Sequence, residues 1–224
     1  MNCLFAVHLS DFLMTAPWWI GGWIITGLML VWACYKFPEK EIPRTALLTA
    51  AFYISSSIHL KLGRTSAHLL LNGLVGTMLG RRMPIAIVIG LVLQAALMQH
   101  GGYYILGLNA VIITLPGMIV PKLFGFLLRE PLQPNRAFVY GGLTGSVTVL
   151  VTISLHAFVL IAGGIEDLSL LAGAGFLAHL PLAVLEGVML ATICRYLAVV
   201  RPELLYPNRK SPNAKGVAET TPPA

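Results

Sequence analysis

Residues 171–200 read LAGAGFLAHLPLAVLEGVMLATICRYLAVV, a stretch of 30 residues with only two charges, Glu186 and Arg195. A helix needs roughly 20 mostly apolar residues to cross the hydrocarbon core of a bilayer, so this stretch predicts a membrane-spanning helix. Six further apolar stretches precede it, at residues 18–35, 46–58, 67–79, 84–98, 104–128 and 137–162. The second, third and fourth of the seven are short, and we expect them to be tilted or extended by buried polar residues.

The composition gives the same picture. Of the 224 residues, 57% are apolar and 11% are charged, and the mean hydropathy is +0.80, whereas soluble domains carry about 25% charged residues. We therefore predict an all-α polytopic membrane protein of about seven transmembrane helices. Residues 1–205 are expected to form a single membrane domain, and the polar, proline-containing residues 206–224 a disordered cytoplasmic tail. The net charge of +6 is scattered through loops, which favours a membrane surface over nucleic acid as partner.

The basic residues predict the orientation. Cytoplasmic loops carry an excess of Lys and Arg. With the N-terminus outside and seven spans, only Lys61 and Arg64 fall outside, and Lys122 lies within a span. The other twelve of the 15 basic residues fall on the cytoplasmic side. We expect the N-terminus outside and the C-terminus in the cytoplasm.

Histidines near the outer ends of their segments suggest a metal-capture site. Neutral imidazole is the commonest protein ligand for transition metals, and His8, His68 and His100 have this position under the predicted topology. The alternative is that such side chains only form hydrogen bonds between helices. The three cysteines are too far apart to predict a disulfide framework or a zinc knuckle.

Polar and small residues inside the spans allow other interpretations. His179 and Glu186 are seven residues apart and share one helical face. This spacing fits a proton relay, but we favour a packing role in which Glu186 pairs with a neighbouring helix. Gly76 and Gly80 form a small-xxx-small pattern, which predicts a close approach of two helices.

Four motifs occur in order along the chain: HLSDFL at 8–13 with Trp18 and Trp19 after it, RTSAHLLLNG at 64–73, QAALMQHGG at 94–102 leading to LGLN at 106–109, and AHLPLAVLEG at 178–187 followed by VRPELL at 200–205. Together they resemble the CbiM/NikM family, the substrate-capture membrane subunits of energy-coupling-factor transporters for cobalt and nickel. The resemblance covers about residues 7–205. It is fairly specific because four motifs recur in order at suitable spacing.

The resemblance implies a metal site at the beginning of the chain. In the family, the terminal amine, the amide nitrogen and imidazole of the second residue, and a second histidine form a planar site of four nitrogens. His8 matches the first imidazole and His68 the second histidine, while Gln94 and Asn109 are expected to orient these ligands. Nitrogen donors in this arrangement suit Ni(II), and low-spin Co(II) can be held similarly.

The sequence departs from the family at its start, because His8 is eighth and not second. With residues 1–6 in place, the nitrogen of Val7 is an amide, and the amine ligand is lost. Either the site is altered, or translation begins at residue 7. GUG encodes valine and is also a bacterial start codon read as methionine, so a start at Val7 would give Met-His-Leu and restore the family opening. We favour that start over a genuine extension.

The leading hypothesis is therefore a subunit in a bacterial or archaeal cell membrane that captures Co(II) or Ni(II) for import. Its partners would be a transmembrane coupling subunit, cytoplasmic ATPase subunits and a small accessory membrane subunit, since this chain has no Walker motif and no enzyme signature. The alternative is an intramembrane metalloenzyme using His156, His179 and Glu186. The nitrogen donors do not distinguish cobalt from nickel.

Overall fold

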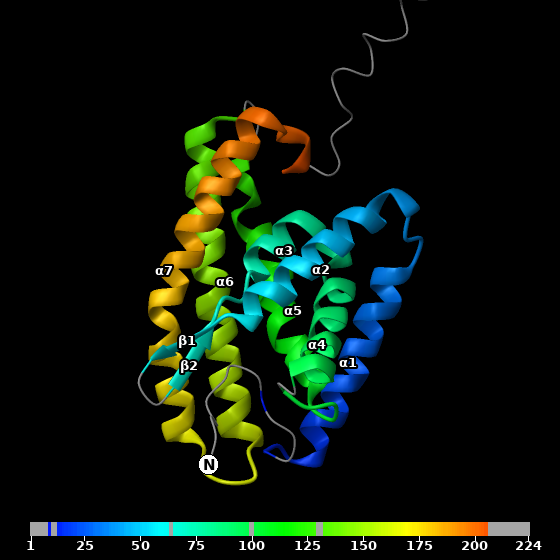
Figure 1. Ribbon diagram of the computed structural model, residues 1–224, viewed down its shortest axis with the longest axis vertical. Coiled ribbons are helices and arrows are strands. Elements are labelled where there is room, and N and C mark those ends of the chain that lie inside the picture. Colours follow the sequence, from blue (N-terminus) through cyan, green and yellow to red (C-terminus); the bar gives the residue numbers. More distant parts are fainter. Residues whose placement is uncertain (1–8, 10–12, 63–64, 99–100, 129–131, 206–224) are drawn as a thin grey trace, which may run out of the picture.

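The computed structural model describes residues 9, 13–62, 65–98, 101–128 and 132–205. Within them the chain is helical apart from one short hairpin and an isolated bridge between Met14 and Gly164 (Figure 1). The α-helices are α1 Ala16–Cys34, α2 Ile42–Ser57, α3 Asn72–Leu79, α4 Met83–Met98, α5 Leu106–Leu123, α6 Pro134–Gly163 and α7 Ser169–Val200. Strands β1 His59–Leu62 and β2 Thr65–His68 pair antiparallel, and 3-10 turns lie at Glu39–Glu41, Gly80–Arg82, Phe124–Leu128 and Pro202–Leu204.

The prediction of a helical, multi-pass membrane protein is confirmed. Each of the seven apolar stretches overlaps one described α-helix. Five segments are long and apolar enough to cross a membrane: Ala16–Cys34, Asn72–Met98, Leu106–Leu128, Pro134–Gly163 and Ser169–Val200. Helix α2 has only 16 residues, and the exact number of crossings stays a prediction.

The apolar stretch at 67–79 does not form one helix. Its first residues belong to β2, in which His68 is the backbone partner of His59, and the helix begins only at Asn72. Between them, Leu71 has a φ of +48°, in the left-handed region that interrupts regular structure. Hydrophobic periodicity alone does not separate a short apolar helix from an extended segment. The contact that fixes this turn comes from α7, far along the chain.

Helix α5 occupies the centre of the bundle. It contacts α1, α3, α4 and α6, and thirteen of its 18 residues are buried. Helix α1, in contrast, exposes large apolar side chains such as Leu28 and Val31. In a membrane protein, such an apolar outer surface faces lipid.

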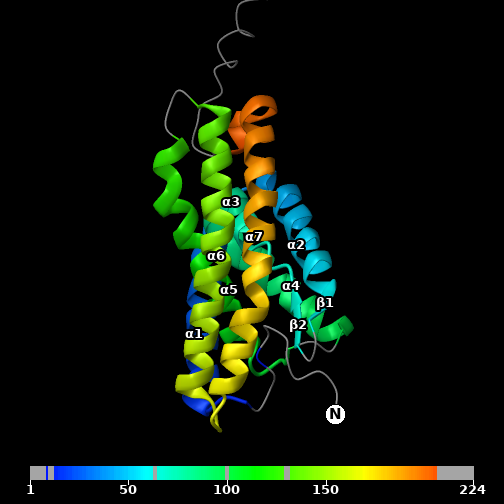
Figure 2. The ribbon, with the colours of Figure 1, turned by 90° about the vertical axis from the view of Figure 1, so that its left-hand side faces the viewer.

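Helices α6 and α7 form a long antiparallel pair (Figure 2). Glycines allow their backbones to touch, since a Cβ at Gly145 would lie 2.6 Å from the carbonyl oxygen of Glu186. A Cβ at Gly141 would likewise lie 2.4 Å from the carbonyl oxygen of Leu190. Small residues of this kind let membrane helices approach closely, and here they fix which side chains of the two helices face each other.

The two ends of the bundle differ (Figure 1). The α6–α7 loop, the start of α1 and the end of α4 lie at one end, and the α1–α2 loop and the end of α7 lie at the other. At this second end the side chain of Arg82 is buried and pairs with Glu41 at 2.7 Å. Its guanidinium also donates to the carbonyl oxygens of Ala33, in the last turn of α1, and of Tyr35 and Lys36, which follow the helix. These carbonyls have no partner within a helix, so Arg82 both caps α1 and ties it to the α3–α4 turn.

Gly76 and Gly80 have different roles. A Cβ at Gly76 would lie 1.7 Å from the carbonyl oxygen of Gly117 in α5, so α3 and α5 are in backbone contact there. Gly80 has open space around its Cβ position and a φ of +50°, and it forms the break between α3 and α4. The predicted close approach of helices therefore holds for Gly76 and not for Gly80.

Replacing Gly76 with alanine is expected to lower the free energy of unfolding by about 1–3 kcal/mol, because the added methyl group forces α3 away from α5. Thermal unfolding of the purified protein in detergent, followed by circular dichroism, measures this. Gly27→Ala is the matched control, since a Cβ at Gly27 meets nothing within 4 Å. If both variants unfold at the same temperature, the α3–α5 contact is not as tight as described.

Candidate metal site

His68 lies at the end of β2, where the chain leaves the hairpin. Its side chain is fully buried. The ring Nδ1 lies 3.2 Å from the carbonyl oxygen of Leu69. A carbonyl oxygen only accepts hydrogen bonds, so Nδ1 carries the proton and Nε2 carries the lone pair with which a neutral imidazole binds a metal.

Glu186 fixes the turn that follows His68. This carboxylate, on α7, accepts hydrogen bonds from the backbone N–H of Leu70 and from that of Leu71. The first N–H groups of a helix lack partners within it, and a negative charge is favourable at that end. Glu186 thus acts as a long-range cap for the start of α3. Glu186 was expected to pair with a neighbouring helix, and its partner is instead the non-helical backbone just before α3.

Asn72, the first residue of α3, adds a second support. Its Nδ2 donates to the carbonyl oxygen of Ile113 at 3.2 Å and to Oγ1 of Thr152 at 2.8 Å. The segment after His68 is thereby connected to α5, α6 and α7. The position of His68 depends on the whole bundle rather than on the hairpin alone.

Asn109, on α5, binds the backbone of Leu9. Its Oδ1 accepts from the N–H of Leu9 and its Nδ2 donates to the carbonyl oxygen of Leu9, both at 3.1 Å. The Leu9 side chain is buried against apolar residues that include Ile105, Ile112 and Leu160. One asparagine therefore satisfies both backbone groups of a residue 100 positions earlier, next to the predicted ligand His8.

Gln94, on α4, is also buried, and its Nε2 donates to the hydroxyl of Ser56 in the last turn of α2. Because α2 leads directly into β1, Gln94 braces the hairpin that ends in His68. Of the predicted site residues, the structure therefore describes His68, Gln94 and Asn109. His8 and Val7 lie outside the described residues. Among the residues that are described, no three His, Cys, Asp or Glu side chains form a group that could hold a metal ion.

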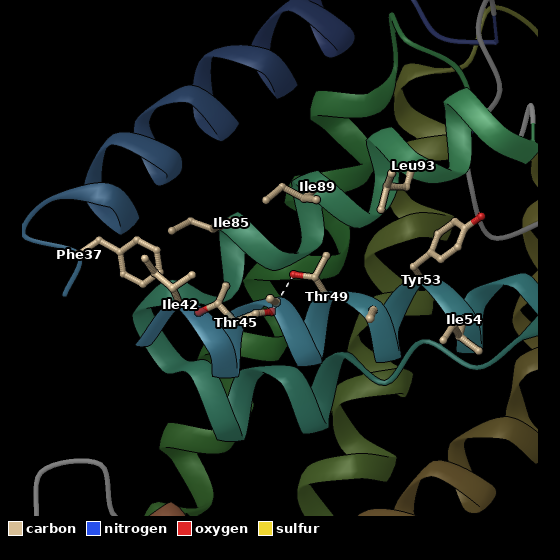
Figure 3. Close-up of a pocket in the computed structure, with 11 residues that line it drawn as sticks. Phe37, Ile42, Thr45, Thr49, Tyr53, Ile54, Ile85, Ile89 and Leu93 are labelled. Atoms are coloured by element: carbon tan, nitrogen blue, oxygen red, sulfur yellow. Dashed lines mark hydrogen bonds between the residues drawn. The ribbon is translucent and has the colours of Figure 1, made fainter. Parts of the chain in front are cut away.

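An apolar groove of about 470 Å³ lies between α2 and α4 (Figure 3). Its polar lining residues are Thr45, Thr49 and Tyr53. The two threonine hydroxyls already donate to backbone carbonyls of their own helix, at 2.9 and 2.8 Å. This groove suits hydrocarbon rather than a metal ion, and it plays no part in the candidate site.

The sequence did not reveal what Glu186 and Asn109 bind. A buried carboxylate and a buried amide at membrane depth signal a polar contact, but their partners are backbone groups of Leu70 and Leu9, which carry no side-chain signal. In the sequence, Arg82 served only to predict which side is cytoplasmic. In the structure its guanidinium binds carbonyl oxygens at the end of α1.

These features define a class of protein: a multi-pass helical membrane protein in which a buried histidine sits on a non-helical segment between the spans. Two solved structures share the fold, a transition-metal transporter and a truncated transition-metal transporter, each with a TM-score of 0.65. They are 20% and 19% identical to this chain, and the alignments cover 85% of it and 90% and 95% of those chains.

The chain belongs to the CbiM family, the cobalt uptake substrate-specific transmembrane region, whose profile matches residues 8–204. It is therefore a membrane component of a metal-uptake system in the cell membrane and not an enzyme. The alternative of an intramembrane metalloenzyme is set aside.

Curated relatives agree with this assignment. A Haemophilus influenzae protein named for metal transport is 28% identical over 203 residues, which are 89% of this chain and 97% of that protein. A Methanocorpusculum labreanum protein named as a fused cobalt transport protein CbiMQ is 24% identical over 216 residues, which are 88% of this chain but only 36% of that longer one.

Replacing Glu186 with leucine is expected to lower the free energy of unfolding by about 2–3 kcal/mol, because buried backbone N–H groups lose a charged acceptor. Glu186→Gln keeps an acceptor oxygen and should cost clearly less. Thr192→Ala, an exposed position of the same helix whose hydroxyl bonds only to the Val188 carbonyl, is the control. Thermal unfolding in detergent ranks the three variants, and a leucine variant as stable as the control would rule out the capping role.

Proposed function

We propose that this protein is the substrate-specificity subunit of an energy-coupling-factor transporter, and that it captures Co(II) or Ni(II) for import. The observation that carries the proposal is the support built around Leu9 and His68. The family match begins at His8, and the next residue, Leu9, is held by both of its backbone groups. Leu9, the residue that follows the first expected imidazole, is thus anchored to α5.

The proposed donors are the imidazoles of His8 and His68 and the nitrogen of Val7, which is a terminal amine when the chain begins at residue 7. His68 has the required protonation, with its proton on Nδ1 directed to a carbonyl. Asn109 and Gln94 act indirectly, the first by holding Leu9 and the second by bracing the hairpin. Nitrogen donors suit Co(II) and Ni(II) alike, and the cobalt names of several relatives favour cobalt as substrate.

We propose that the end of the bundle with the α6–α7 loop and the start of α1 faces the outside of the cell. Arg44, Arg82 and Arg201 lie at the opposite end, together with Lys36 and Lys40, and an excess of basic residues marks the cytoplasmic side. We propose residues 1–205 as one membrane domain, or 7–205 if the chain starts at Val7, with residues 206–224 as a cytoplasmic tail.

The proposed partners are a transmembrane coupling subunit and ATPase subunits, with a small accessory membrane subunit. The fused CbiMQ relative supports a membrane partner, since this chain matches only 36% of it and the remainder belongs to the same polypeptide. The ATPases are inferred from the class of transporter alone.

His68→Ala is expected to weaken Co(II) binding by at least about 100-fold, since loss of one nitrogen donor costs more than the 10–100-fold effect of residues that only orient a ligand. The measurement is equilibrium dialysis of Co(II) and Ni(II) against purified protein that begins at residue 7. Ser154→Ala, at an exposed position of α6, should bind as tightly as wild type. Undiminished binding by a folded His68→Ala variant would refute the site.

A separate prediction concerns the backbone nitrogen of Val7 as a metal ligand. Protein translated from residue 7, with Val7→Met as the start, should bind Co(II) at least about tenfold more tightly than protein translated from Met1, a difference of about 1.4 kcal/mol. Only the first form offers an amine at that position. Equal affinities of the two forms would remove this nitrogen from the ligand set, and intact-mass measurement of natively expressed protein identifies the natural start.

A further inference from the structure

Two histidines outside the proposed site lie in the interface between α6 and α7. His156 is on α6 and His179, which is only 2% exposed, is on α7. Ile153 of α6 and Ala183 of α7 pack in one cluster, and His156 and His179 each lie one turn beyond them, at the same level of this antiparallel pair. The Nε2 atoms of both rings are buried and have no hydrogen-bond partner within the described part of the chain.

The protonation of His179 is set by its own helix. Its Nδ1 lies 2.7 Å from the carbonyl oxygen of Gly175, one turn earlier. This carbonyl accepts the Nδ1 proton, so the Nε2 atom of neutral His179 presents a lone pair. A buried acceptor without a donor costs about 1–3 kcal/mol, and lipid offers no water to satisfy it.

The surroundings of the pair offer little that could satisfy these nitrogens. The apolar cluster that holds Ile153 and Ala183 also contains Leu70 and Val149, with Phe176 packed against it. Thr152, one turn before His156 on α6, already accepts from Asn72 and donates to the Thr148 carbonyl. The two unpartnered nitrogens therefore have mainly hydrocarbon neighbours.

We propose that His156 and His179 together bind a divalent transition-metal ion through their Nε2 atoms, at a second site inside the helical bundle. Imidazole nitrogen is a good donor for Co(II), Ni(II) and Zn(II). The donors come from α6 and α7, and neither belongs to the set around His8 and His68. The proposal rests on the proposed function only for the choice of probe ion.

Two protein nitrogens are fewer donors than the four of the other proposed site, so this site binds more weakly. A weak second site suits a transported ion, because binding must be favourable enough to admit the ion and weak enough to release it.

The test is a Co(II) titration of purified, metal-free full-length protein in detergent, followed by visible absorption and equilibrium dialysis. Wild-type protein should show two classes of site. His156→Ala and His179→Ala should each weaken the second class by at least about tenfold, or 1.4 kcal/mol, and leave the tighter class unchanged. His68→Ala should weaken the tighter class and leave the second class unchanged. The control Ser154→Ala should bind Co(II) at both classes of site as wild type does.

These outcomes separate the two proposals. If His68→Ala has no effect while the two other variants remove a site, the pair binds metal and the proposed function fails. If His156→Ala and His179→Ala bind Co(II) with the same stoichiometry and affinities as wild type, the second site does not exist.

His156→Phe protects the test against misfolding, because phenylalanine keeps a ring of similar size and removes the nitrogens. In the absence of metal this variant should unfold at the wild-type temperature or above, since it removes an unsatisfied acceptor. Co(II) at a concentration that fills the second site should raise the unfolding temperature of wild type more than that of His156→Phe, because binding stabilises only the folded state. Equal increases would also overturn the proposal.

Discussion

The structure depends on one constraint: inside a membrane, every backbone polar group that leaves a helix must find its partner within the protein. The chain meets this demand at three places with one side chain each. Glu186 satisfies the N–H groups before α3, Asn109 satisfies Leu9, and Arg82 satisfies the carbonyls at the end of α1. Each of these side chains belongs to a different element from the backbone that it serves. The non-helical segments are therefore held by the bundle, and the two segments expected to carry metal donors are among them.

The helices could be predicted from the sequence because their cause is local. A long apolar stretch in lipid forms a helix whatever its neighbours do, so each of the seven stretches overlaps a described α-helix. The prediction of a single helix over residues 67–79 was wrong because the structure there depends on a distant contact. Leu69, Leu70 and Leu71 are as apolar as any helix residue, but the backbone there is bonded to Glu186, which lies 116 residues from Leu70 in sequence. Hydropathy carries no information about such a contact.

The candidate site, too, could be predicted only in part from the sequence. The resemblance to a family pointed to His68, Gln94 and Asn109, and all three are buried. The resemblance did not give the partners of these residues. Asn109 binds backbone groups of Leu9, and every residue type except proline offers the same two groups. The ligand roles of His8, His68 and Val7 and the orienting roles of Gln94 and Asn109 stay predictions. The proposed pairing of His156 with His179 also required the structure, since the packing of α6 on α7 brings the two positions to the same level of the bundle.

The two hydrogen bonds between Asn109 and the backbone of Leu9 act as a tether that holds Leu9 against α5. Releasing Leu9 costs two hydrogen bonds and the exposure of one buried leucine, on the order of 3–5 kcal/mol. At that cost the tether is loose in between about one molecule in a hundred and one in several thousand. Such a local opening releases Leu9 without unfolding any helix, and if His8 binds the ion as proposed, it limits how long the ion stays bound.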